Sequence, residues 1–81
     1  MQGGRTAAGP AAAPPRLLLP GMSGGDVETL QTALRRTGFY RGLIDGEFGP
    51  ETKAAVEAYQ RARALTVDGI VGPATRRPLG I

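Results

Sequence analysis

The chain of 81 residues contains no cysteine, no histidine and no tryptophan. Without cysteine it cannot form a disulfide, and the two side chains that most often bind zinc are both absent. The lack of histidine also removes the commonest general base of enzymes. These absences argue against a metalloenzyme or a hydrolase, so we expect a protein that is not an enzyme and uses neither a metal ion nor a cofactor.

The formal net charge of +3 overstates how basic the folded part is, because Arg5 and Arg16 lie near the N-terminus. From residue 17 onward, the chain has eight basic and seven acidic side chains. Such a balance gives little field to attract phosphate groups, so no nucleic-acid partner is expected. No apolar run is long enough to span a membrane, and the N-terminal residues lack the apolar core of a signal peptide.

The composition divides the chain into two parts. Residues 1–16 are mostly glycine, alanine and proline, and are predicted to form a flexible arm or linker. Residues 17–81 are predicted to form one domain, close to the smallest size that folds without disulfides or metals.

Two helices are indicated by apolar residues at helical spacing. The first is expected over residues 24–37, with Ser23 as its N-cap and Gly38 as a left-handed residue that ends it. The second is expected over residues 50–63, because Pro50 at the first helical position loses no hydrogen bond.

A third helix is expected to begin at Pro73 for the same reason. Pro78 has no N–H to donate and its ring clashes with the preceding turn, so this helix is expected to cover only residues 73–77, with Leu79 folded back onto the core. The predicted fold is therefore mainly α, a compact three-helix domain with a short third helix.

Two sequence patterns occur twice. Asp-Gly-x-x-Gly-Pro-x-Thr is found at residues 45–52 and again at 68–75, and its first glycine allows the positive φ of a tight turn. Gln31 and Gln60 occupy inward-facing positions of the first two helices. Because an unsatisfied buried amide costs about 1–3 kcal/mol, each glutamine is expected to hydrogen-bond the neighbouring turn. The residues of this structural motif are Gln31, Asp45, Gly46, Gly49, Thr52, Gln60, Asp68, Gly69, Gly72 and Thr75.

With these residues the chain resembles the peptidoglycan-binding domain family, the small three-helix modules of cell-wall hydrolases. The family pattern covers residues 17–79, and the chain departs from it at Pro78, where the family usually continues its third helix. The resemblance implies non-catalytic binding of peptidoglycan through its stem peptide. It also implies that the domain anchors an attached or associated partner to the wall, in the cell envelope, periplasm or extracellular space.

The candidate ligand-binding residues are a tyrosine and several arginines. Tyr40 and Arg41 are expected on a loop of a rigid scaffold, where binding residues tend to collect. Stem peptides expose carboxylates, which arginine binds in bidentate fashion, so Arg63, Arg76 and Arg77 are further candidates. For each arginine the alternative of a solvated surface side chain stays open.

Other functions remain as alternatives. The chain would also suit a structural subunit of a phage particle or another envelope-associated assembly, with residues 1–16 packed on a neighbouring protein subunit. Some metalloprotease prodomains share this helical architecture, but they need a cysteine to block zinc. Asp45 and Glu47 suggest a calcium loop, yet the remaining oxygen ligands of such a loop are missing.

Overall fold

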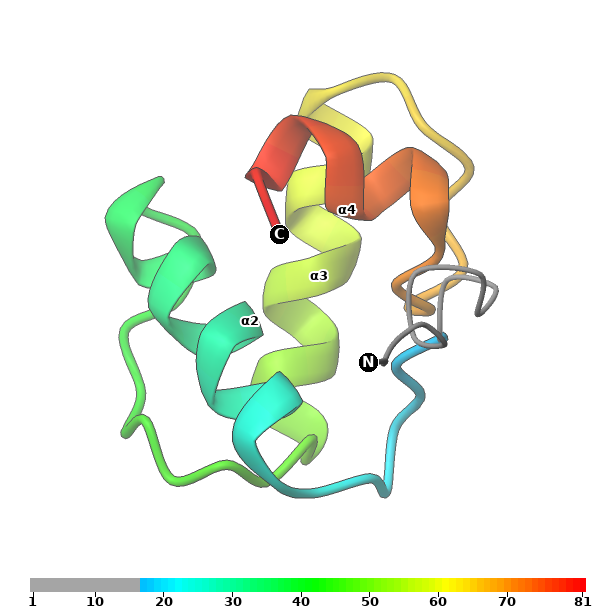
Figure 1. Ribbon diagram of the computed structural model, residues 1–81. Coiled ribbons are helices and arrows are strands. Elements are labelled where there is room, and N and C mark those ends of the chain that lie inside the picture. The colour runs from blue at the N-terminus through cyan, green and yellow to red at the C-terminus, as the bar shows by residue number, and fades with distance from the viewer. Residues whose placement is uncertain (1–16) are drawn as a thin grey trace, which may run out of the picture.

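The computed structural model describes residues 17–81. These residues contain three helices: α2 (Gly25–Arg36), α3 (Pro50–Ala62) and α4 (Pro73–Leu79). Figure 1 shows α2 and α3 beginning at the same end of the domain and running in the same direction, with α4 crossing the far end of α3. The expected mainly α, three-helix fold is confirmed, whereas the expected arm at residues 1–16 lies outside the described residues.

The core lies where the apolar faces of the helices meet. Each of the two turns also adds one side chain at the same place in the repeated pattern, Phe48 in the first and Val71 in the second, at 2% and 0% exposure. Leu79 is folded back onto the core as predicted, at 3% exposure. The buried apolar residues are Leu18, Val27, Leu30, Ala33, Leu34, Tyr40, Phe48, Ala55, Val56, Tyr59, Val71 and Leu79.

Residues 17–24 form backbone hydrogen bonds with both turns. Leu18 exchanges two backbone hydrogen bonds with Val71 in the second turn, at 3.0 and 2.9 Å. Further along, the N–H of Gly24 donates to the carbonyl of Gly46 in the first turn at 2.9 Å. A single extended segment therefore connects both turns before α2 begins.

The expected N-cap of α2 is wrong. The cap position is occupied by Gly24, with φ of 123°, and no side chain caps the helix. Ser23 instead forms an antiparallel bridge with Glu47. The extended backbone that this pairing requires places Ser23 one residue too early to cap the helix, and Gly24 makes the turn into α2.

Each helix ends in the same way. The left-handed residue after the helix and the residue that follows it donate their N–H groups to carbonyls of the last helical turn. The left-handed residue is Gly38 after α2 and Gly80 after α4, with φ of 89° and 77°, but it is Ala64 after α3, with φ of 58°.

The length predicted for α4 is wrong, because the helix continues through Pro78 to Leu79. The fixed φ of proline is itself helical, and only its missing N–H opposes the helix. Here the proline lies in the last turn, where the N–H groups of Gly80 and Ile81 donate to the carbonyls of the two arginines that precede Pro78, both at 3.1 Å. These closing bonds hold the final turn in place of the one that proline cannot make.

Replacing Ala64 with glycine should stabilise the domain by about 0.5–1 kcal/mol. An L-residue in the left-handed region costs roughly 1–2 kcal/mol, which exceeds the roughly 0.5–1 kcal/mol that glycine loses in chain entropy. Urea denaturation would measure the gain. Ala62→Gly, two residues earlier and still helical, is the matched control and should lower stability; a loss in both variants would contradict the explanation.

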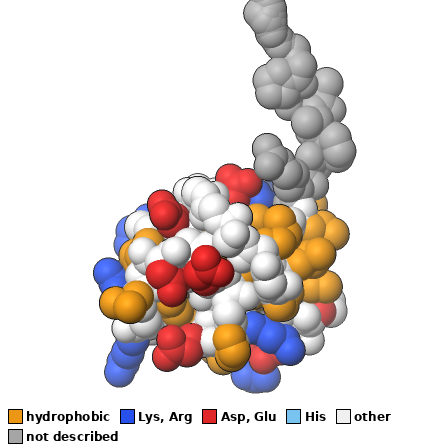
Figure 2. Space-filling model, turned by 90° about the horizontal axis from the view of Figure 1, so that it is seen from below, with side chains coloured by type: hydrophobic (Ala, Val, Ile, Leu, Met, Phe, Trp, Pro, Cys, Tyr) orange, Lys and Arg blue, Asp and Glu red, His pale blue; other side chains and the backbone are white. Residues whose placement is uncertain are grey.

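Charge is distributed along the helices in agreement with their dipoles. Acidic side chains occupy the first turns of α2 and α3, and arginines occupy the last turns. Figure 2 views the domain from the end where α2 and α3 begin, and acidic side chains gather near the middle of this face, with hydrophobic ones on the right of the view. The exposed large hydrophobic residues are Leu17, Leu19, Met22, Leu43 and Val67.

Candidate functional site

Gln31 fastens the first turn to α2. Its side chain has 0% exposure, and its Oε1 accepts a hydrogen bond from the N–H of Gly46 at 2.9 Å. Its Nε2 lies 3.0 Å from each of three acceptors, the Asp45 carboxylate, the Glu47 carbonyl and the Thr52 hydroxyl, and 3.4 Å from the Tyr40 hydroxyl oxygen. Because a primary amide has two N–H groups, these four acceptors must share them.

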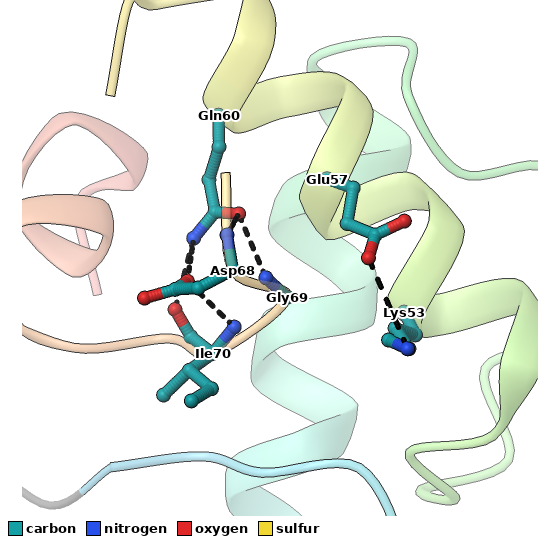
Figure 3. A network of polar contacts seen from close by, with 6 residues as sticks. All are labelled: Lys53, Glu57, Gln60, Asp68, Gly69 and Ile70. Atoms are coloured by element: carbon teal, nitrogen blue, oxygen red, sulfur yellow. Dashed lines mark hydrogen bonds and ion pairs between the residues drawn. The ribbon is translucent and has the colours of Figure 1, made fainter. Parts of the chain in front are cut away.

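Gln60 makes a similar set of contacts with the second turn (Figure 3). Its Oε1 accepts from the N–H groups of Asp68 and Gly69 at 3.1 and 3.0 Å. Its Nε2 lies 3.0 Å from the Asp68 carboxylate, 2.9 Å from the Ile70 carbonyl and 3.1 Å from the Thr75 hydroxyl. The hydrogen bonds expected from the two glutamines are thus present in both turns, with matching partners.

The two aspartates cap their own turns. The carboxylate of Asp45 accepts from the N–H of Glu47, and that of Asp68 from the N–H of Ile70, each at 2.9 Å. These backbone bonds, followed by the bond from the glutamine, hold the pKa of each carboxyl below its ordinary value. A carboxyl with a lowered folded-state pKa stabilises the fold above the ordinary range near pH 4, and the stabilisation is lost as pH falls through the lowered pKa.

The two repeats differ in the length of the loop before the turn, which is longer between α2 and the first turn than between α3 and the second. Asp45 lies seven positions after Gly38, but Asp68 lies only four positions after Ala64. The extra residues of the first loop lie against α3, and a hollow of about 500 Å³ is left between them. We call this the loop–α3 hollow; it is lined by Gly38, Phe39, Tyr40, Arg41, Gly42, Glu51, Ala54, Ala55 and Ala58.

The rim of the loop–α3 hollow is fixed by two hydrogen bonds. The Tyr40 hydroxyl donates to the Leu43 carbonyl, and the Arg35 guanidinium donates to the Gly42 carbonyl at 2.7 Å. A side chain at Gly42 has no room, because its Cβ would lie 2.7 Å from the Tyr40 hydroxyl oxygen and 3.0 Å from Oε1 of Glu51. The loop is therefore packed directly against the start of α3.

The structure brings together two of the four candidate ligand-binding residues. Tyr40 and Arg41 both line the loop–α3 hollow, although Tyr40 is buried at 5% exposure. Arg63 lies over the ring of Tyr59, 5.4 Å from its centre. Arg76 lines a different hollow near the C-terminal residues.

Arg77, a further candidate, lines the same hollow as Arg76. Glu51 lines the loop–α3 hollow but was not among the candidate ligand-binding residues named from the sequence. An acidic residue just after a helix-starting proline is explained by the helix dipole alone, so its sequence position gave no sign of a site.

Within residues 17–81, no group of three or more acidic side chains could hold a metal ion, and none of the helices is long and apolar enough to cross a membrane. Three short helices, two glutamine-bonded turns and a shallow hollow on the surface describe a small helical binding module. A family model described as "Putative peptidoglycan binding domain" matches residues 23–79. The chain belongs to the peptidoglycan-binding domain family.

Similar proteins are found among cell-wall enzymes. An N-acetylmuramoyl-L-alanine amidase of Mycobacterium tuberculosis is 54% identical over 56 residues, which cover 69% of this chain and 14% of that protein. A zinc D-Ala-D-Ala carboxypeptidase of Streptomyces albus G is 49% identical over 63 residues, which cover 72% of this chain and 24% of that protein. The chain thus matches less than a quarter of the length of either relative.

Solved structures give the same result for the fold. The crystal structure of the SleB N-terminal domain superposes with a TM-score of 0.79 at 40% identity, covering 80% of this chain and 89% of that one. A Burkholderia AP3 phage endolysin superposes with a TM-score of 0.76 at 41% identity, covering 79% of this chain and 24% of the endolysin.

Proposed function

We propose that the domain binds bacterial peptidoglycan without cleaving it, that it contacts the stem peptide, and that it thereby anchors an attached or associated partner to the wall. The observation that carries the site assignment is the loop–α3 hollow, whose lining combines the charged residues Arg41 and Glu51 with apolar ones. The same hypothesis places the domain at the wall or outside the cell.

The chemistry of the loop–α3 hollow suits a short peptide. Arg41 is exposed, and its guanidinium offers paired N–H donors to a carboxylate of the stem peptide. The apolar lining of the hollow suits the small methyl side chains of alanine residues and consists of Phe39, Ala54, Ala55 and Ala58. Arg63 and Arg76 remain candidate contacts at other places on the surface, outside this hollow.

The proposed anchoring role rests on the relatives. Those named as an amidase and a carboxypeptidase contain the matched segment as a minor part of their length, which leaves most of each protein for a separate catalytic part. A weak module of this kind gains effective concentration for whatever is linked to it, since a linked second binding event becomes intramolecular.

Cosedimentation with purified sacculi at low salt tests the proposed function. The full chain should pellet with the sacculi in a saturable manner and with modest affinity. Failure to pellet, under conditions where circular dichroism shows the protein to be folded, would refute wall binding. Residues 17–81 alone should pellet equally well; loss of binding would instead assign the contact to residues 1–16.

Arg41→Ala should weaken binding to sacculi about fivefold, because it removes the carboxylate-binding group of the loop–α3 hollow. Arg61→Ala is the matched control, since Arg61 is also an exposed arginine but does not line this hollow. Binding isotherms from cosedimentation would compare the two. An equal loss in both variants would mean that overall charge, rather than this site, governs binding.

A further inference from the structure

We infer that the Tyr40 hydroxyl is a positioning group for Arg41: it holds the loop that carries this arginine in the conformation that binds a carboxylate of the stem peptide. This inference rests on the proposed function. It adds a residue that acts through Arg41 rather than on the ligand, and it connects the ligand site to the buried amide of Gln31.

The loop that carries Arg41 has little backbone support of its own. Among the described residues, no backbone–backbone hydrogen bond involves any of residues 41–45. The carbonyl of Leu43 is bonded instead by a side chain, because it accepts a hydrogen bond from the Tyr40 hydroxyl. This bond closes a small ring of chain that contains Arg41, so the position of the arginine depends directly on the hydroxyl.

The hydroxyl is itself held by the interior of the domain. Tyr40 is buried, and its hydroxyl oxygen lies 3.4 Å from Nε2 of Gln31, the amide that fastens the first turn to α2. The backbone of Gly42 packs closely against the same hydroxyl, since a Cβ at this glycine would lie 2.7 Å from its oxygen. The loop is therefore tied to a buried network rather than to a mobile surface side chain.

The second repeat has no such link. Thr66 occupies the position of Tyr40, two residues after the left-handed residue that ends the helix, but Thr66 is exposed. Nε2 of Gln60 has three acceptors, whereas Nε2 of Gln31 has the Tyr40 hydroxyl as a fourth. Because the second turn is fastened without a tyrosine, fastening the turn does not explain why the first repeat has one. The longer loop with its arginine does.

A loop that is already ordered binds more tightly, because less conformational freedom is lost when the ligand arrives. Without the hydroxyl, the aromatic ring would still fill its place in the core, but the Leu43 carbonyl would bond to water and the loop would sample further conformations. Affinity falls in proportion to the fraction of loops that present Arg41 correctly.

Binding isotherms of the full chain with purified sacculi, measured by cosedimentation, test the inference. Tyr40→Phe should bind about fivefold more weakly than the unmodified chain while circular dichroism shows it to be folded. In a chain that already carries Arg41→Ala, the same substitution should weaken binding by less than about twofold, because the group that it positions is gone. Tyr59→Phe is the matched control: it removes the other tyrosine hydroxyl, which is buried without a hydrogen-bond partner among residues 17–81, and should leave binding unchanged.

Arg35→Ala is a second variant, which decides the question even if Tyr40→Phe fails to fold. The exposed Arg35 guanidinium donates to the Gly42 carbonyl at 2.7 Å, so its removal should loosen the same loop and weaken binding about threefold, again only where Arg41 is present. Arg36→Ala is its control, because it removes the same charge from the same helical turn and should leave binding unchanged.

The inference is overturned if Tyr40→Phe binds like the unmodified chain, if its loss is the same with and without Arg41, or if Tyr59→Phe loses as much. Each of these results leaves peptidoglycan binding intact. Undiminished binding of Arg41→Ala would refute the assigned site and the inference together, and failure of the unmodified chain to bind sacculi would refute wall binding itself.

Discussion

Gln60→Leu is expected to destabilise the domain by about 3 kcal/mol, although it adds an apolar side chain to the interior. The substitution leaves the N–H groups of Asp68 and Gly69 and the carbonyl of Ile70 without the partner that the amide supplies. Each unsatisfied buried group costs about 1–3 kcal/mol, and the three together outweigh the roughly 1.5–3 kcal/mol gained from burying leucine. For a domain of this size the melting temperature should fall by more than about 10 °C.

Thermal denaturation followed by circular dichroism measures this loss. Ala62→Leu is the control, because it adds leucine at an exposed position of the same helix and should change stability by less than about 0.5 kcal/mol. Gln31→Leu should behave like Gln60→Leu, since its amide makes the matching contacts in the first turn. A melting temperature of Gln60→Leu that is unchanged or raised would show that the turn does not depend on the amide.

These glutamines explain why so much of the fold could be predicted from the sequence. A glutamine at an inward-facing helical position has few ways to satisfy its amide, and the repeated Asp-Gly turn offers several donors and acceptors close together. The prediction holds despite unequal spacing, since Asp45 lies fourteen positions after Gln31 and Asp68 lies eight positions after Gln60. The local chemistry of each turn, rather than the length of the loop before it, determines the contact.

The errors arose where a residue was judged without its neighbours. Pro78 opposes a helix when considered alone, but the bonds made by Gly80 and Ile81 complete the last turn of α4. Ser23 is a favourable N-cap by residue type, yet its backbone is used in pairing with Glu47. In both cases a contact outside the local pattern decided the outcome.

The candidate site was harder to predict for a related reason. Gly42 and Glu51 are nine residues apart, and nothing in either pattern indicates that they meet. Their proximity follows from the extra length of the first loop and from the packing of Tyr40 beneath it. Sequence reasoning found the arginine on this loop because loops often bind ligands, but it missed the opposing carboxylate on α3.

Gly46→Ala is expected to destabilise the domain by about 2–3 kcal/mol, more than alanine at either of two other glycines with nearly the same φ. The three are Gly46, Gly69 and Gly80, with φ of 76°, 72° and 77°. The left-handed backbone alone costs an alanine roughly 1–2 kcal/mol, less the roughly 0.4–1 kcal/mol gained by restricting the unfolded chain. Gly80→Ala should show this backbone effect alone, because no atom lies within 4 Å of its added Cβ.

Gly69→Ala and Gly46→Ala should differ in stability from each other, because their added Cβ atoms meet different neighbours. A Cβ at Gly69 would lie 3.2 Å from two carbons of Lys53, a flexible side chain that can move aside. A Cβ at Gly46 would lie 3.3 Å from the carbonyl oxygen of Gly24, a backbone atom beside the hydrogen bond that joins the first turn to α2. In urea denaturation, the loss of stability should therefore be smallest for Gly80→Ala, intermediate for Gly69→Ala and largest for Gly46→Ala. Equal losses at all three positions would mean that backbone conformation alone requires glycine there, and that close packing of the turns against their helices contributes nothing.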